Sequence, residues 1–435
     1  MEHDRGGAEL TARHQRARDE LRPPFPCPCA RPRHVEIIRL FRSDERFSWT
    51  APLRGSSISF GRTKYMDAII IGGGIAGPLA AIAVRELGGT ATVYEAHGQS
   101  TGANVGAGLT LAVNGIAALH SIGVAQPIVA QGFPSRHIEL CSGSGKVLGV
   151  VPIGGELDDG TVTHTLRRSD LYRTIAELAH DRGVRFVHGK KLLDADVVSG
   201  GRARAIFADG TQAHGDLLVG ADGVHSAVRR ALDPSAPQPS YAGLVNVGGF
   251  TPDDLGLQPG TYRMVFGKRA FFGFTVSPIR ETWWFANLPR KRPLSRDELA
   301  AITQSQWREQ IVAAFADDVG PMRELVERTA GTIVATNQHE LPRVPCWHRG
   351  PIGLLGDAAH AVSPSSGQGV SMAAEDVVAL AKCLAEARDP STALARYTSL
   401  RRDRVERVVA YGAAMNSKKL PGPIGRAFRD LTLPI

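Results

Sequence analysis

The clearest pattern of apolar and polar positions in the chain lies between residues 67 and 95. An apolar run typical of a buried strand, residues 68–71, leads into a glycine-rich turn and then into an alanine-rich segment that ends near Leu87. A second strand-like run ends at Glu95. Pro78 falls in the first turn of the predicted helix, where its missing N–H removes no hydrogen bond. This order of segments predicts a strand, a glycine turn, a helix and a second strand.

Three glycines in the turn, Gly72, Gly74 and Gly77, have the spacing of the dinucleotide-binding fingerprint. In that motif the first glycine permits a tight turn, the second lets the backbone approach a pyrophosphate, and the third lets the helix pack closely on the strand. Glu95 follows Gly77 by 18 residues, where an acidic side chain accepts hydrogen bonds from an adenosine ribose. The fingerprint does not separate NAD from FAD, because both carry a free adenosine 2′-hydroxyl.

A membrane span is the alternative interpretation of this segment. Residues 68–84 carry no charge and reach the lower limit of length for a span. Four glycines and a proline in the same window, together with its strand-like start, favour the dinucleotide-binding turn.

The middle of the first half predicts short strands and one helix. The glycine-rich passage 98–108 is either a loop that wraps a cofactor or a plain crossover, and residues 115–122 have the pattern of an amphipathic helix. Residues 136–164 alternate weakly between glycines, which predicts short strands with turns. A helix is predicted from Ser169, its expected N-cap, and Arg168 precedes it. Arg168 is either positioned for an acidic ligand or an ordinary surface arginine.

Two Asp-Gly pairs have different settings. Asp209-Gly210 lies between two strand-like runs, which is the signature of a tight hairpin. Asp222-Gly223 follows a strand and precedes a helical segment, 227–232. We therefore expect the first pair to be structural and the second to lie near a ligand at the carboxyl end of a strand.

Aromatic residues gather in extended, glycine-punctuated runs between residues 241 and 290. Such a cluster either lines an apolar pocket for a small molecule or forms the core of an antiparallel sheet. Residues 295–328 have a helical, amphipathic pattern, and residues 333–341 return to that of a strand.

The last informative stretch is residues 353–386. A buried strand, 352–355, ends at Gly356-Asp357, and a loop with Pro364, Gly367 and Gly369 leads into a helix from about residue 370. A glycine-rich first turn presents unpaired N–H groups and the positive end of the helix dipole. His360 is either a catalytic residue or a hydrogen-bonded structural one, and the second interpretation is favoured because no partner stands at metal-ligand spacing.

Charge and cysteine content narrow the function classes. The formal net charge is +8, but residues 1–65 hold 13 basic and 8 acidic side chains, so the rest of the chain is nearly balanced and a nucleic-acid partner is not indicated. We expect residues 1–65 to be a disordered or non-native extension before a true start at Met66, with a basic nucleic-acid arm as the alternative. Five scattered cysteines without a CxxC pair predict no disulfide framework, no metal site and a cytoplasmic location.

Three motifs stand in a fixed order: GGGIAG with Glu95, then GADGVHSAVRR at 220–230, then GDAAHAVSPSSGQGVSMAAED at 356–376. Together they resemble the single-component FAD-dependent aromatic hydroxylases, the para-hydroxybenzoate hydroxylase-like flavoprotein monooxygenases. The resemblance covers the chain from Met66 onward. It implies an α/β fold with a discontinuous Rossmann-like FAD-binding domain, residues 66–240 and 346–435, and a smaller β-sheet substrate domain, residues 241–345.

The resemblance also implies roles for residues. Gly72, Gly74 and Gly77 would hold the FAD pyrophosphate, Glu95 the adenosine ribose, and Leu192 would contact adenine through its backbone. Arg168 would lie near the pyrophosphate or ribityl chain, while Asp222 and Gly223 would contact FAD and support NAD(P)H binding. Gly356 and Asp357 would bind the ribityl chain, and the isoalloxazine ring would be bordered by Pro364, Gly367 and Gly369.

The activity that the resemblance implies uses FAD as cofactor, with NAD(P)H and O2, to hydroxylate a small aromatic or polycyclic substrate through a flavin C4a-hydroperoxide. An epoxidase, an N-hydroxylase, an antibiotic-modifying enzyme or a non-redox FAD-binding protein are the alternatives. Tyr241, Tyr262, His339 and His360 are candidates by residue type for a catalytic base. The sequence does not fix the substrate, the choice of NADH or NADPH, or the oligomeric state.

Overall fold

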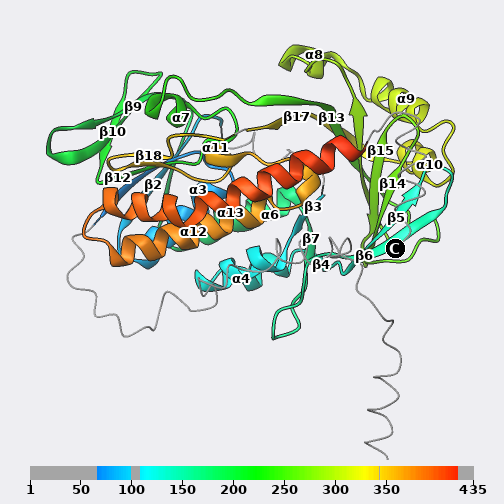
Figure 1. The fold of residues 1–435 in the computed structure, drawn as a ribbon, viewed down its shortest axis with the longest axis horizontal. Helices are drawn as coiled ribbons and strands as arrows, with labels where there is room; N and C mark the ends of the chain where they lie inside the picture. Colours follow the sequence, from blue (N-terminus) through cyan, green and yellow to red (C-terminus); the bar gives the residue numbers. More distant parts are fainter. Residues whose placement is uncertain (1–65, 99–107, 342, 420–435) are drawn as a thin grey trace, which may run out of the picture. The chain divides into compact units, whose positions relative to one another are not determined.

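The computed structural model describes residues 66–98, 108–341 and 343–419 (Figure 1). The predictions made for residues 1–65, and most of the predicted loop 98–108, lie outside the described residues.

A six-stranded sheet carries the dinucleotide-binding fingerprint. Strand β1 (Asp67–Ile71) pairs in parallel with β2 (Thr90–Glu95) and β12 (Leu217–Gly220). β19 (Ile352–Leu354) pairs in parallel with β12, although the two strands are separated by more than a hundred residues of chain. Two edge strands complete the sheet, β8 (Arg185–His188) beside β2 and β18 (His348–Arg349) beside β19. Distant parts of the sequence therefore build one sheet, and the predicted α/β class with a discontinuous Rossmann-like domain is confirmed.

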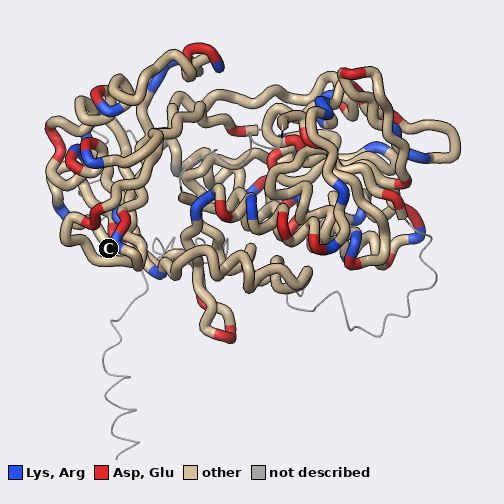
Figure 2. The backbone as a smooth tube through the Cα atoms, turned by 180° about the vertical axis from the view of Figure 1, so that it is seen from behind, with Lys and Arg blue, Asp and Glu red and all other residues tan. Residues whose placement is uncertain are grey.

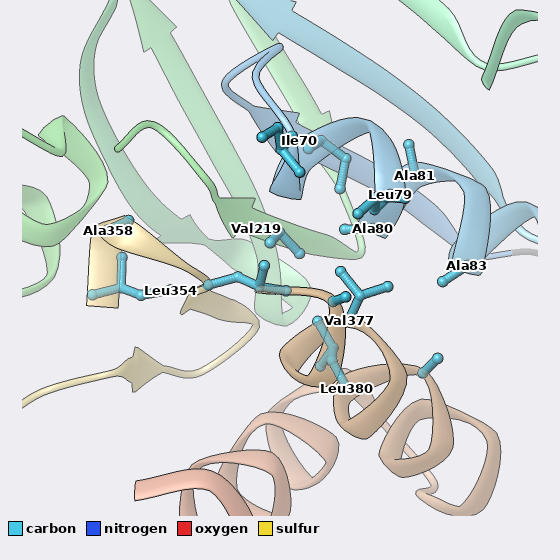
Figure 3. Packing of buried hydrophobic residues seen from close by; sticks show 14 of the residues in the cluster. Ile70, Leu79, Ala80, Ala81, Ala83, Val219, Leu354, Ala358, Val377 and Leu380 are labelled. Atoms are coloured by element: carbon cyan, nitrogen blue, oxygen red, sulfur yellow. The ribbon is translucent and has the colours of Figure 1, made fainter. Parts of the chain in front are cut away.

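Helix α3 (Ala76–Glu86) packs between this sheet and helix α12 (Gly369–Glu386). Figure 3 shows Leu79 and Ala80 of α3 close to Val219 of β12 and to Val377 and Leu380 of α12. Small alanine side chains on α3 let the helices approach closely, so the apolar core joins the first and the last predicted motif.

Helix α4 (Val113–Ser121) crosses α12 at a glycine. A Cβ added at Gly115 would lie 2.7 Å from Cβ of Ser371. The predicted amphipathic pattern is wrong for this helix, because every residue in it is buried except His120. The helix lies in the interior of the molecule instead of on its surface.

Two small sheets join the large one. Antiparallel strands β9 (Leu192–Val198), β10 (Arg202–Phe207) and β11 (Gln212–Gly215) form the first, and Asp209-Gly210 makes the predicted turn between β10 and β11. The second contains β3 (Gly108–Leu111), β7 (His164–Arg167) and β4 (Phe133–Pro134). The remaining helices in this part of the chain are α5 (Ala125–Val129), α6 (Arg168–Asp181), η1 (Ser199–Gly201), α7 (Ala227–Leu232), α11 (Asp357–His360), η2 (Pro364–Ser366) and α13 (Pro390–Lys419).

Helix α6 begins earlier than the sequence predicts. Arg167 is its N-cap and Arg168 is its first residue, so the expectation that Ser169 caps the helix is wrong. No side chain caps this end, and strand β7 runs directly into the helix. Arg168 is therefore held at the junction of a strand and a helix.

A seven-stranded sheet, in the order β17-β13-β16-β15-β14-β5-β6, contains most of the predicted aromatic cluster. One face of the sheet packs against three short helices, where Trp284 stacks on Phe272 with ring centroids 5.5 Å apart and Phe315 meets Phe272 edge to face. The elements of this region are β5 (His137–Ser142), β6 (Val147–Pro152), β13 (Ser240–Thr251), β14 (Thr261–Phe266), β15 (Phe271–Val276), β16 (Thr282–Pro289), α8 (Arg296–Ala301), α9 (Gln304–Ala314), α10 (Met322–Glu327) and β17 (Ala330–Glu340).

The domain boundaries at residues 240 and 345 remain a prediction. The hairpin of β5 and β6 lies within the segment 66–240, yet β5 pairs in parallel with β14 of the seven-stranded sheet. Sheet pairing thus brings residues 137–152 to the strands of the predicted substrate domain.

The membrane-span interpretation of residues 68–84 is wrong, because β1, a turn and α3 divide this segment. Among the described residues, no helix has the length and apolar content that crossing a membrane requires. Figure 2 shows basic and acidic positions interspersed along the described chain in that view.

The third fingerprint glycine generates a stability prediction. A Cβ at Gly77 would lie 1.9 Å from the carbonyl oxygen of Gly72, so Gly77→Ala forces the helix and the turn apart. We expect the free energy of unfolding to fall by about 1–3 kcal/mol, as for other overpacked sites, measured by chemical denaturation.

Gly155→Ala is the matched control, because a Cβ at that position meets nothing within 4 Å. It should change the free energy of unfolding by less than about 0.5 kcal/mol. Equal stability of the two variants would contradict the close contact between helix and turn.

Candidate functional site

Two of the three fingerprint glycines are required by close contacts within the protein, and the third is not. Gly72 has φ +109°, and a Cβ there would lie 2.3 Å from the carbonyl oxygen of Ala221. Gly77 is equally constrained by Gly72. A Cβ at Gly74 would meet only the Tyr172 side chain, with its hydroxyl at an ordinary 3.6 Å. Space therefore remains beside Gly74, where the fingerprint places a pyrophosphate.

Glu95 is held at the carboxyl end of β2, directly beside the glycine turn. Its Oε2 accepts a hydrogen bond from the Gly73 N–H at 2.7 Å, and its Oε1 accepts one from the His97 N–H at 2.8 Å. The Lys190 N–H donates to the Glu95 carbonyl at 2.8 Å. This contact brings the start of β9 to the same end of the sheet, with the Leu192 side chain buried.

Arg168 lies near Gly74 through Tyr172. Its Nη2 donates to the Tyr172 hydroxyl at 3.3 Å, while its buried Nε has no hydrogen-bond partner among the described residues. Burial works to lower the pKa of this guanidinium, but Tyr172 and Asp357 outweigh that effect and leave the pKa raised. The Arg168 cation therefore lies close both to Tyr172, which stands beside Gly74, and to Asp357 of the third motif.

Asp357 is exposed, although Gly356 and Ala358 on either side are buried. Surrounding protein raises the pKa of its carboxyl, against the opposing charges of His360 and Arg168. The charges of Arg168 and His360 favour the ionised carboxylate. Asp357 thus presents an exposed carboxylate near Arg168, and its neighbour Gly356 lies against the fingerprint helix, because a Cβ there would lie 3.2 Å from Cβ of Ala76.

The Asp222 carboxylate caps helix α7. It accepts hydrogen bonds from the Ser226 hydroxyl at 2.5 Å and from the N–H groups of Ala227 and Val228 at 2.6 and 3.2 Å. Burial raises its pKa despite these bonds. Gly223 has φ +76°, which favours glycine. The carboxylate is engaged by its own helix, so any contact of this pair with a ligand stays a prediction.

Arg229, which the sequence did not single out, connects the second motif to the third. Its Nη1 donates to the Ala358 carbonyl at 2.9 Å and its Nη2 to the Val224 carbonyl at 2.7 Å. The side chain is 1% exposed, and burial lowers its pKa. The Arg229-Arg230 pair gave no signal in the sequence, because the partners of Arg229 are backbone carbonyls.

The loop before α12 has the predicted glycine-rich form. Gly367 has φ +62°, and a Cβ there would lie 3.2 Å from the Thr110 hydroxyl of β3. Gly369 is the first residue of α12, and no side chain caps this N-terminus. Pro364 begins η2. The N-terminal N–H groups of an 18-residue helix therefore point to the region between β3 and this loop.

A buried network of charges fixes the start of α12, and the sequence analysis missed it. Asp376 accepts hydrogen bonds from the Gly356 N–H at 3.1 Å and from Arg401 Nε at 2.7 Å, and it also contacts His360 Nε2. Glu375 pairs with Arg401 and Arg404 of α13, each at 2.7 Å. Both carboxylates are fully buried. Adjacent acidic residues in one segment and closely spaced arginines in the other were the available signal, but pairing across helices is not visible in one sequence.

The network extends to α4. Asn114 Nδ2 donates to Glu375 Oε1 at 2.8 Å and to Gln368 Oε1 at 3.0 Å. Burial alone would raise the pKa of Glu375 and Asp376, but the arginines, with His360 acting on Asp376, hold both values below the usual range. Both groups are therefore charged in the folded protein.

The structure separates the four base candidates. His360 is buried against Asp376, which supports the structural interpretation. The Tyr262 hydroxyl accepts from Thr165 at 3.2 Å, and burial raises its pKa to about 12, so Tyr262 keeps its proton near neutral pH. Burial raises the pKa of Tyr241 and lowers that of His339, whose ring lies 5.1 Å from that of His225. The contacts of these four residues do not identify a catalytic base, and the proposed roles stay predictions.

Comparison with known proteins identifies the family. The sequence pattern of the family described as "FAD binding domain" matches residues 65–411. The chain belongs to this family. The resemblance to the para-hydroxybenzoate hydroxylase-like flavoprotein monooxygenases is thereby confirmed.

Curated relatives in this family are oxygenases. The chain is 31% identical over 358 residues to the FAD-dependent urate hydroxylase of Klebsiella pneumoniae, covering 79% of this chain and 88% of that protein. It is 30% identical over 350 residues to the aurachin C monooxygenase/isomerase of Stigmatella aurantiaca, covering 79% and 87%. The crystal structure of Klebsiella pneumoniae HpxO complexed with FAD and uric acid has a TM-score of 0.75 at 27% identity, covering 85% of this chain and 92% of that one.

The residues present fit FAD. The space beside Gly74 suits the FAD pyrophosphate. The Arg168 guanidinium, whose Nε donor is unused among the described residues, is a cation that would neutralise the phosphates. The accessible carboxylate of Asp357 suits the ribityl hydroxyls. Among the described residues, no cluster of histidine, cysteine and acidic side chains is arranged to hold a metal ion.

Asp357→Ala tests the role of the Asp357 carboxylate as a hydrogen-bond acceptor for FAD. Loss of a charged hydrogen-bond acceptor is expected to weaken FAD binding about ten-fold or more. The measurement is the dissociation constant of FAD, from fluorescence titration of the apoprotein. Asp158→Ala, at an exposed position, is the control and should bind FAD as the wild type does. Unchanged affinity in Asp357→Ala would show that this carboxylate does not touch the cofactor.

Arg401→Met tests the buried network. The substitution leaves two buried carboxylates short of a cation, so we expect the free energy of unfolding to fall by about 3–5 kcal/mol at neutral pH. Arg396→Met on the same helix is the control, because that arginine is exposed and its ion pair with Glu386 is long, at 3.9 Å. The control should cost less than about 1 kcal/mol.

The pH dependence of the same comparison gives a second test. Because the folded pKa values of Glu375 and Asp376 are lowered, their stabilisation is complete above the ordinary carboxyl range, about pH 4 to 5, and is lost as the pH falls through the folded values. The difference between wild type and Arg401→Met should shrink in acid. A difference that stays constant would exclude ionised carboxylates as its cause.

Proposed function

We propose that this protein is an FAD-dependent monooxygenase that uses NAD(P)H and O2 to hydroxylate a small aromatic or heterocyclic ring. The observation that carries the proposal is the approach of three distant segments, which bring together the space beside Gly74, the Arg168 cation bonded to Tyr172 and the exposed Asp357 carboxylate near Arg168. Membership of the FAD-binding family, whose relatives include hydroxylases of urate and of an aminohydroxybenzoate, supports both the cofactor and the substrate class.

The proposed placement of FAD follows the glycine turn. Gly72, Gly74 and Gly77 lie along the pyrophosphate, Glu95 takes the ribose, and the backbone near Leu192 approaches adenine. Arg168 neutralises the phosphates, and Gly356-Asp357 receives the ribityl hydroxyls. Pro364, Gly367 and Gly369 border the ring system, and Asp222-Gly223 supports NAD(P)H at the surface.

Once bound, the flavin supplies the oxygen-activating redox chemistry, and the chain supplies position and electrostatics. The N-terminus of α12 directs unpaired N–H groups at the ring system and stabilises negative charge there. Aromatic side chains on the face of the seven-stranded sheet opposite α9 and α10, such as Phe271 and Phe285, would exclude water from the reacting atoms. Catalysis therefore depends on orienting an electron-rich ring more than on a dedicated acid or base.

The substrate itself is proposed only as a class, and the cellular setting rests on cysteine chemistry. Cys141, Cys346 and Cys383 are free thiols, which suits the reducing cytoplasm.

Turnover with product analysis tests the proposal. The purified protein should carry a flavin absorption spectrum and should oxidise NAD(P)H faster when an accepted aromatic or heterocyclic ring is added. Hydroxylated product should account for most of the NAD(P)H consumed, measured by chromatography alongside a peroxide assay. A protein that binds FAD but releases peroxide in equal amount with every ring tested would be a flavin oxidase or an idle flavin binder, and the monooxygenase proposal would fail.

A further inference from the structure

Three side-chain amides form a cluster on the seven-stranded sheet. Asn246 of β13 lies directly opposite Asn287 of β16. Asn287 Oδ1 accepts hydrogen bonds from Asn246 Nδ2 and from Gln338 Nε2, each at 2.8 Å. Gln338 belongs to β17, on the other side of β13, so the cluster spans three adjacent strands.

The cluster leaves one donor and one acceptor unpaired. Asn287 Nδ2 and Gln338 Oε1 are buried without a hydrogen-bond partner among the described residues, and the two side chains are 1% and 3% exposed. Buried polar atoms are normally paired, so two adjacent exceptions require an explanation. Reversing the three amides together exchanges the roles of oxygen and nitrogen but still leaves one donor and one acceptor free.

The cluster lies on the face of the sheet that is turned toward the proposed flavin. Side chains alternate along β17, so Gln338 shares its face with Glu340. Glu340 Oε1 accepts from Asn416 at 2.6 Å, and Asn416 in turn accepts from Ser365 in the loop before α12. The opposite face carries Asn337, which bonds to Leu294 beside α8.

Apolar rings surround the cluster on the same face. Phe271 lies directly opposite Asn287, and Phe285 is two residues before it on β16. Phe271, Phe266 and Leu148 form a small cluster with Phe285 packed against it. A flat ligand held against this face would meet aromatic side chains and the unpaired donor and acceptor of the two amides.

We propose that Asn287 and Gln338 form hydrogen bonds with one edge of the substrate ring, and that this edge carries a hydrogen-bond acceptor next to a donor. A lactam, or the keto form of a hydroxylated nitrogen heterocycle, has this chemistry. A carboxylate has acceptors only and leaves the free carbonyl of the cluster unpaired. The inference rests on the proposed function, because it assigns the substrate class of the same site.

Paired ligands on the flavin-loaded full-length protein test the inference. 2-Quinolone and coumarin have the same shape and differ in a ring N–H against a ring oxygen. We expect the wild type to bind 2-quinolone about ten-fold or more tightly, since a buried acceptor rejects an analogue without the N–H. The measurement is the change in flavin absorbance on titration.

Gln338→Met is the decisive variant, because it removes the unpaired Gln338 Oε1, together with the bond from Gln338 Nε2 to Asn287, at nearly constant volume and leaves the bond between Asn246 and Asn287. The preference for 2-quinolone should fall below about three-fold while the affinity for coumarin holds. Gln212→Met, at an exposed position of β11, is the matched control and should keep the wild-type preference. Flavin content and thermal unfolding verify that each variant is folded.

The outcomes separate this inference from the proposed function. A purified protein that does not bind flavin removes the proposed function and the inference with it. A flavin-loaded, turnover-competent wild type that binds coumarin as tightly as 2-quinolone, or binds neither, overturns the inference alone. An undiminished preference in folded Gln338→Met also overturns it.

Discussion

One buried carboxylate, Asp376, sets the position of the candidate site. It receives the Gly356 N–H, His360 and Arg401, so a single anion orients the turn after β19, the short helix α11 and the long helix α13. An uncompensated charge in this interior would be costly, and each of these partners is therefore required in place. Asp357 follows Gly356 directly, so the position of this exposed carboxylate depends on a residue that is itself fully buried.

The same network makes the site a product of long-range folding. Glu375 takes its partners from α4 through Asn114 and from α13 through Arg404, and the core between α3 and α12 closes over the fingerprint helix. None of these elements can bury its polar groups alone. The position of Asp357 relative to Gly74 thus depends on the packing of α12 and α13 on the first βαβ unit.

The sequence predicted what short-range chemistry determines. The fingerprint turn, the hairpin at Asp209-Gly210 and the uncapped helix after Gly369 depend on residues close in the chain, and the structure has all three. The contacts of Arg229 and Arg401 were missed because their partners lie 129 and 25 residues away. Strand register decides which aromatic residues face the helices and which face the flavin side, and register is set by pairing with distant strands.

The two faces of the seven-stranded sheet illustrate why a single pattern of aromatic residues supported two interpretations. On one face Trp284 and Phe272 belong to a core with α9 and α10, where any change in volume costs stability. On the other face Asn287 belongs to the amide cluster and Phe285 packs against Phe271, Phe266 and Leu148, although both are immediate neighbours of core residues along β16. Because alternate residues of one strand meet these separate demands, one run of aromatic residues can supply both the core and the proposed substrate surface.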